Sequence, residues 1–146
     1  MPLDHATDTV RLAGLAASLS SELYTVQEKC LHEATAKEIS EIADELARLS
    51  TTLWHLDEAI SADPSQYTEA FNEDLKEITT ELASSFEEIS ECCAGLQTAD
   101  SNVSAVAWFF KKGRVGRLLK HLEALKGTLV VMRTVLWHGK DYGTHK

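Results

Sequence analysis

The residues of this chain that could do chemistry are concentrated in one stretch, AVAWFFKKGRVGRLLK, which runs from Ala105 to Lys120. It holds three consecutive aromatic residues, Trp108, Phe109 and Phe110, followed within ten positions by five cations and no acid. The five cations are Lys111, Lys112, Arg114, Arg117 and Lys120. Aromatic side chains beside lysines and arginines are typical of segments that bind anionic headgroups at a membrane surface. These eight residues are therefore the candidate membrane or partner surface.

The same stretch also fits a purely structural role. In that interpretation residues 108–110 seal the end of a helical core, and the cations face solvent or acidic helices of the same domain. If all five cations reached an anionic surface, they would contribute on the order of 5 kcal/mol, at about 1 kcal/mol each. Both interpretations stay open at the level of sequence.

Catalysis and metal binding find little support in the sequence. It contains no Gly-rich phosphate loop, no Glu-x-x-His pair of the kind that builds di-metal sites in helical bundles, and no local Ser, His and Asp arrangement. The six histidines are scattered, and Cys30 with His32 forms a single pair rather than a zinc framework. We expect a non-enzymatic protein with no catalytic residue, no cofactor and no metal site.

Nucleic acid is a weak candidate partner. The run from Gly113 to Gly116 matches the Gly-x-x-Gly of an RNA-binding KH loop, but that loop needs a neighbouring sheet, and no segment alternates as a strand does. Residues 1–100 carry a formal charge of −16 and residues 101–146 carry +7, which gives the net charge of −9. An acidic domain repels a polyanion, so we expect part of the basic charge to be neutralised within the domain.

The length, cysteine count and hydropathy indicate one intracellular domain. A chain of 146 residues is the size of a single domain, here residues 1–146, and can bury a core without metal or disulfide. The three cysteines have no paired spacing, and no secretory hydrophobic region follows Met1. The longest uncharged runs, 12–21 and 101–110, are half of the roughly 20 residues that a membrane-spanning helix needs. We expect a cytoplasmic protein without a membrane span.

Four segments carry apolar residues three or four positions apart, which predicts amphipathic helices. The first starts at Asp8 as N-cap and ends near His32, and the third covers 67–96. The second and fourth are heptad seams, with apolar residues spaced 3, 4, 3, 4, 3 and 4. The seams are Ile39, Ile42, Leu46, Leu49, Leu53, Leu56 and Ile60, and Val115, Leu118, Leu122, Leu125, Leu129, Met132 and Leu136.

The boundaries between these helices follow from turn-forming residues. Asp63-Pro64 ends the second helix and begins the third, and Gly139 stops the fourth. Residues 103–110 form a short helical turn of their own, with a break at Gly113. The predicted fold is all-α, an antiparallel four-helix bundle with a short extra helical turn before the last long helix.

Several of these residues resemble a known family. They are Trp108-Phe109-Phe110-Lys111-Lys112, Leu118-Leu119 and Leu122-Glu123-x-x-Lys126-x-x-Leu129 in the last helix, the Glu45-Leu46-x-x-Leu49-x-x-x-Leu53-x-x-Leu56 run, and Gly14-Leu15-Ala16. This pattern resembles the HeLo-like N-terminal domain of fungal STAND proteins, which are NOD-like receptors. The resemblance covers nearly the whole chain, and its motifs are mostly leucine spacing.

The resemblance implies a signalling bundle that is normally fused to a nucleotide-binding domain. Relatives are thought to oligomerise and to permeabilise membranes in programmed cell death, with the apolar first helix as the inserting element. Transferred to this chain, that element is Val10, Leu12, Leu15, Ala16 and Leu19. Charged residues interrupt the N-terminus, which in the family is often nearly uncharged, and this argues against spontaneous insertion.

The sequence therefore leads to two hypotheses about function. The first is a non-enzymatic signalling module of a fungal NOD-like receptor that acts by self-association and reaches membranes, as a peripheral protein, on activation. The alternative is a protein-protein interaction or homodimerisation adaptor without membrane contact, because a heptad seam does not specify whose helix fills it.

Overall fold

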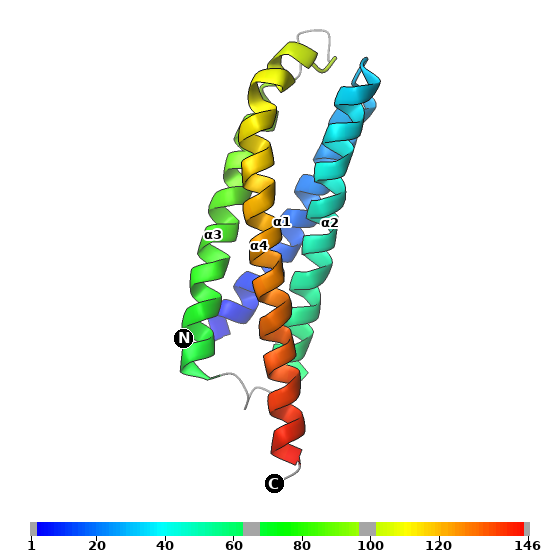
Figure 1. Cartoon of the computed structure of the whole chain (residues 1–146). Helices are drawn as coiled ribbons and strands as arrows, with labels where there is room; N and C mark the ends of the chain where they lie inside the picture. Colours follow the sequence, from blue (N-terminus) through cyan, green and yellow to red (C-terminus); the bar gives the residue numbers. More distant parts are fainter. Residues whose placement is uncertain (1–2, 63–67, 97–101, 145–146) are drawn as a thin grey trace.

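The computed structural model describes the backbone of residues 3–62, 68–96 and 102–144, and the side chains of 9–62, 68–96 and 102–136. Four helices make up almost all of these residues: α1 (Leu3–Glu28), α2 (Glu33–Ala62), α3 (Glu69–Ala94) and α4 (Ala105–Thr144) (Figure 1). No described segment forms a strand, so the predicted all-α four-helix bundle is confirmed. In the described residues, no helix is both long enough and apolar enough to cross a bilayer.

The two heptad seams form the centre of the core. All seven seam residues of α2 are buried, and six of the seven in α4 are buried, with Leu118 half-buried. Apolar residues from α1 and α3 complete the core, among them Leu12, Leu23, Leu75 and Leu82, which are inaccessible or almost so. The sequence pattern predicted this core because residues three and four apart lie on one face of a helix.

The start of α3 differs from the predicted boundary. Thr68 is the N-cap, and its hydroxyl accepts a hydrogen bond from the backbone N–H of Phe71 at 3.1 Å. The helix therefore begins at Glu69, and the predicted start at Pro64 lies outside the described residues. A threonine hydroxyl satisfies one of the unpaired N–H groups at a helix start.

The last helix is longer and more continuous than predicted. It runs unbroken from Ala105 to Thr144, so the separate turn at residues 103–110, the break at Gly113 and the stop at Gly139 are all wrong. Helix-interior glycine costs about 1 kcal/mol relative to alanine, and the buried seam on the same helix outweighs that cost. Ser104 starts the helix, because its hydroxyl accepts a hydrogen bond from the N–H of Ala107 at 3.1 Å.

The first helix also starts and ends earlier than predicted. It begins at Leu3, so Asp8 lies inside the helix rather than at its N-cap, and it ends at Glu28 rather than near His32. The N–H groups of Lys29 and Cys30 close the last turn by donating to Val26 and Gln27 at 3.1 Å each. This tight turn brings α2 back along α1.

The turn after α1 and the segment before α4 contact each other at one end of the bundle. The N–H of Val103 donates to the carbonyl of Lys29 at 3.2 Å, and Cys30 and Val103 form an isolated parallel bridge. This end therefore holds the C-termini of α1 and α3 and the N-termini of α2 and α4 (Figure 1). As a result, α1 and α3 run in one direction, and α2 and α4 run in the other.

The helices pack in the cyclic order α1, α2, α4, α3. Consecutive helices are antiparallel, as predicted, but α2 and α3 lie across the bundle from each other, and among the described residues no Cα atoms of the two helices come within 8 Å. The remaining neighbours, α1 with α3 and α2 with α4, are parallel pairs. The basic α4 is thus held between the acidic helices α2 and α3, and the α1–α3 pair forms a separate side of the molecule.

Candidate interaction surfaces

The aromatic residues at the start of α4 do not act as one unit. Trp108 is only 3% exposed and belongs to the core, whereas Phe109 and Phe110 are 65% and 77% exposed. The prediction that residues 108–110 together seal the core is therefore wrong for Phe109 and Phe110. Trp108, in turn, cannot belong to an exposed membrane or partner surface. The cause is helical geometry, since neighbouring positions differ by about 100° around the axis.

Val106 joins the two phenylalanines on the outer face of α4. It is 67% exposed, and positions 106, 109 and 110 are spaced as i, i+3 and i+4, so the three side chains share one face. The rings of Phe109 and Phe110 meet edge to face with centroids 5.8 Å apart. We call Val106, Phe109 and Phe110 the α4 ridge. Large exposed apolar groups in contact with one another are typical of binding surfaces.

Two of the five predicted cations pair with acidic helices of the same molecule. The Nζ of Lys112 lies 3.7 Å from a carboxylate oxygen of Glu38 in α2 and 5.5 Å from the centre of the Phe109 ring. Arg114 pairs with Glu88 in α3, also at 3.7 Å. Exposed pairs of this kind contribute at most about 1 kcal/mol. These two cations can therefore leave their partners at small cost.

The other three predicted cations make no ion pair with a described residue. Arg117 and Lys120 are exposed on the outer face of α4, and Lys111 is half-buried beside Gly95, where its Nζ would lie 2.8 Å from an added Cβ. Of the five predicted cations, two thus pair with acids of the same molecule, and three make no ion pair with a described residue. Partial internal neutralisation was expected from the charge distribution.

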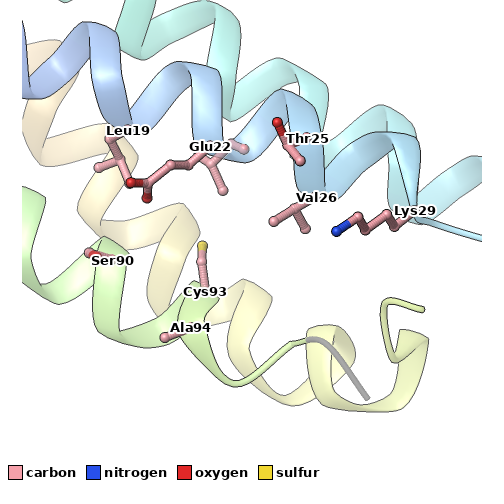
Figure 2. Close-up of a pocket in the computed structure, with 9 residues that line it drawn as sticks. Leu19, Glu22, Thr25, Val26, Lys29, Ser90, Cys93 and Ala94 are labelled. Carbon is pink, nitrogen blue, oxygen red and sulfur yellow. The ribbon is translucent and has the colours of Figure 1, made fainter. Parts of the chain in front are cut away.

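A groove runs between the parallel helices α1 and α3. It consists of two adjoining hollows of about 360 Å³ and 530 Å³ that share Leu19, Glu22 and Ser90. Figure 2 shows the first hollow, with α1 side chains from Leu19 to Lys29 facing Ser90, Cys93 and Ala94 of α3. We call both hollows together the α1–α3 groove. Each volume lies in the range of about 300–1,000 Å³ that is usual for ligand pockets.

The groove has an apolar floor and an acidic rim. Leu19 and Phe86 line its floor, and Leu15, at 46% exposure, lines the second hollow. At the rim, Glu22, Glu87 and Glu91 are partly or fully exposed, and no ion pair joins them to another described residue. These three acids were not among the candidate site residues predicted from the sequence. Sequence alone does not show that acids on two separate helices face each other.

The thiol of Cys93 lies at the inner wall of this groove (Figure 2). Burial, and to a smaller extent the neighbouring Cys92, raises the pKa of the Cys93 thiol to about 11. The thiol is therefore protonated at neutral pH and is a poor nucleophile. It contributes to the wall as a small apolar group.

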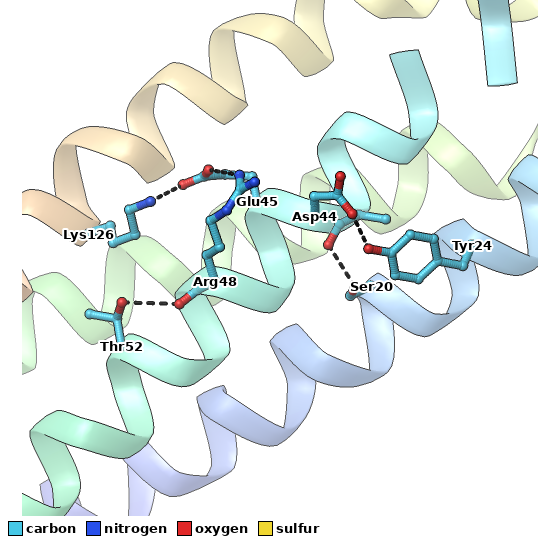
Figure 3. Close-up of polar contacts among 8 residues, drawn as sticks. Ser20, Tyr24, Asp44, Glu45, Arg48, Thr52 and Lys126 are labelled. Atoms are coloured by element: carbon cyan, nitrogen blue, oxygen red, sulfur yellow. Dashed lines mark hydrogen bonds and ion pairs between the residues drawn. The ribbon is translucent and has the colours of Figure 1, made fainter. Parts of the chain in front are cut away.

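Polar contacts fix α2 against both of its neighbours and so place the two surfaces (Figure 3). On the α1 side, the hydroxyl of Ser20 donates to the carbonyl of Ala43 at 2.7 Å, and the hydroxyl of Tyr24 donates to the carboxylate of Asp44. That bond to Asp44 raises the pKa of Tyr24, since the carboxylate favours the protonated phenol. These bonds define the register of α1 against α2.

On the α4 side, the buried carboxylate of Glu45 holds two cations. One oxygen lies 2.6 Å from Nζ of Lys126, and the other lies 3.2 Å from Arg48 one turn along α2 (Figure 3). Glu45 is 7% exposed, and a buried acid is tolerated where it is paired. This contact fixes α4 along α2 and thereby positions the α4 ridge.

The predicted N-terminal effector residues are mostly core residues of the bundle. Leu12 and Ala16 are fully buried, Leu19 is 6% exposed, Val10 is partly buried, and only Leu15 lies largely open. In the folded chain this apolar face of α1 is therefore packed against its neighbours. Insertion into a membrane would require its release from the core.

Within the described part of the chain, no three His, Cys, Asp or Glu side chains gather where a metal ion could bind. The two surfaces that the geometry singles out are the α4 ridge and the α1–α3 groove. No family model, curated protein or solved structure matches this chain.

Proposed function

We propose that this chain is a non-enzymatic signalling module of the HeLo-like type found in fungal NOD-like receptors, and that it acts by self-association. The observation that carries the proposal is the α4 ridge, where three large apolar side chains stand exposed on a folded bundle. The resemblance of the leucine-rich motifs to HeLo-like domains and the four-helix architecture support the choice of this class. Programmed cell death is the process in which such modules act.

The exposed apolar residues of α4 support the proposed self-association. Besides its buried seam, α4 exposes the ridge near its start and a second group, Val130, Val131 and Val135, at 47%, 60% and 58% exposure. The outer face of α4 also carries exposed cations such as Arg117 and Lys120, and the ridge is the apolar group on it in which two exposed rings contact each other. The ridge is therefore the part of this face that we expect to bind a further partner.

Peripheral binding to an anionic membrane is the second activity that we propose for the module. Leu31, in the turn after α1, is 75% exposed at the same end of the bundle as the ridge. Lys111, Arg117 and Lys120 are free of ion pairs with described residues and lie on the helix that carries the ridge. Apolar side chains with adjacent cations can insert among acidic headgroups.

The oligomeric state with and without vesicles tests both activities. We expect light scattering to show concentration-dependent self-association in buffer, and sedimentation to show binding to vesicles of an anionic phospholipid. A strict monomer at high concentration, with and without vesicles, would contradict the proposed function. Association in buffer without vesicle binding at physiological salt would instead favour the alternative, an interaction or homodimerisation adaptor that does not contact lipid.

Charge reversal on the exposed face of α4 tests the membrane activity. Arg117→Glu with Lys120→Glu changes two exposed cations that have no described partner, so the fold should be retained. We expect at least about a tenfold loss of vesicle binding, because each cation near an anionic surface contributes about 1 kcal/mol. Arg133→Glu, at an exposed position near the other end of α4, is the matched control. The control changes the net charge half as much as the double variant does, so a loss of binding free energy half as large would indicate net charge rather than a local surface.

A further inference from the structure

We infer that the α1–α3 groove of one copy binds the α4 ridge of a second copy. This inference rests on the proposed self-association and names the two surfaces that carry it. Both surfaces are present on every molecule; each has an apolar part, and their charges are mainly opposite.

The apolar parts of the two surfaces are complementary. Val106, Phe109 and Phe110 occupy positions i, i+3 and i+4 of α4, a spacing with which the apolar side chains of a helix anchor in a groove. The groove offers an open apolar floor between two helices, including the half-exposed Leu15. Its two hollows, of about 360 Å³ and 530 Å³, provide room for two aromatic side chains.

The charges of the two surfaces are opposite. The turn of α4 that follows the ridge presents Arg114 and Arg117, and the groove presents three acids, Glu22, Glu87 and Glu91, and one cation, Lys29. None of the three acids is neutralised by a described residue. Arg114 has only a surface pair at 3.7 Å to give up. Opposite charges around an apolar centre favour one orientation of the partner.

Gly113 and Gly116 leave the surface of α4 open next to the ridge. A Cβ added at Gly116 would meet nothing within 4 Å, and one at Gly113 would meet only the Arg117 side chain at 3.8 Å. A helical glycine costs roughly two- to fivefold in local helix stability relative to alanine, and it allows the backbone of another chain to approach closely. A second copy can therefore come close to the backbone of α4 at these two positions.

A molecule cannot fill its own groove with its own ridge. Helices α1 and α4 lie across the bundle from each other and make no contact among the described residues, and the ridge is on the outer face of α4. The contact is therefore heterologous, since one copy contributes its ridge and the other its groove, and the bound pair still presents one free ridge and one free groove. Such contacts build rings or open chains rather than a closed symmetric dimer.

Two variants that each lose one surface test the inference. Phe109→Ser with Phe110→Ser disables the ridge, and Leu15→Lys with Glu87→Lys disables the groove; all four positions are substantially exposed, so folding should be retained. We expect each variant alone to be monomeric, with a dissociation constant raised at least tenfold. Mixing the two should restore a complex that stops at one copy of each, because one intact ridge and one intact groove remain.

The matched control is Val131→Ser with Val135→Ser, which removes comparably exposed apolar groups from the same helix. We expect this control to associate as the unchanged chain does. If the unchanged chain associates but the mixture of ridge and groove variants stays monomeric, the inference is overturned while the proposed function stands. If the unchanged chain does not associate at all, the proposed function fails and the inference fails with it.

Discussion

Single residues determine where the helices sit, and Glu45 is the clearest example. It is a nearly buried acid that bridges α2 to Lys126 of α4 and also contacts Arg48. A buried charge is stable only with its partner, so both members of the pair matter. The position of α4, and with it the ridge, depends on this contact.

Replacing Glu45 with alanine should therefore destabilise the bundle. The change leaves the ammonium group of Lys126, whose side chain is 26% exposed, without its acid. We expect the free energy of unfolding in urea to fall by about 1–3 kcal/mol. Glu41→Ala, an exposed acid on the same helix, should change it by less than about 0.5 kcal/mol. Equal losses for both variants would show that the pair has no special role.

The thiol of Cys93 should be protected in the folded chain. Because burial raises its pKa to about 11, we expect an alkylating reagent at pH 8 to modify it more slowly than Cys30, and mass spectrometry can compare the two sites. An unfolded thiol ionises near 9, below the folded value. The protonated thiol therefore contributes to stability below pH 9, and this contribution is lost between pH 9 and about 11. Rapid alkylation of Cys93 in the native chain would contradict the burial.

At the scale of elements, α1 is a structural helix, and Leu15 is the exposed residue among the predicted effector residues. Leu12, Ala16 and Leu19 face the core, whereas Leu15 faces the groove. In the folded chain, the predicted effector residues thus mainly stabilise the bundle. A role in membranes would require the bundle to open, which exposes the same apolar residues that hold it together.

Two substitutions in α1 compare the contribution of its core face to stability with that of its groove face. Leu12→Ala should lower the free energy of unfolding by about 2–5 kcal/mol, as large-to-small changes in a core do. Leu15→Ala, at 46% exposure, should cost less than about 1 kcal/mol. Urea unfolding followed by circular dichroism measures both. A larger cost at Leu15 than at Leu12 would contradict the packing of α1.

At the scale of the whole molecule, the charges are separated by helix. The balance is −16 in residues 1–100 and +7 in residues 101–146, so α4 is basic and its neighbours α2 and α3 are acidic. Ion pairs between α4 and both neighbours neutralise part of the positive charge of α4. The remaining exposed cations can pair with acids of a second molecule.

Self-association should therefore weaken as salt is raised. Going from about 0.1 M to about 1 M salt shortens the screening length from about 10 Å to about 3 Å. Because the ridge and groove carry opposite charges, we expect the dissociation constant from sedimentation to rise severalfold. Association that strengthens with salt would indicate a purely apolar contact, such as one through Val131 and Val135.

The sequence by itself determined the helices and the core. The spacing of apolar residues identified the buried seams of α2 and α4, since residues three and four apart share a face whatever surrounds them. Helix ends were predicted less well. Asp8, Gly113 and Gly139 are local signals, and the helices nevertheless continue through all three positions.

Only the tertiary structure decided the surfaces. It buried Trp108, exposed Phe109 and Phe110, and paired two of the five cations with acids far away in sequence. It also placed α1 beside α3 rather than α2 beside α3, and so brought Glu22 opposite Glu87. Heptad patterns give each helix a buried face but do not specify which helix covers it. Interhelical packing makes that choice, and in this protein it produced both the ridge and the groove.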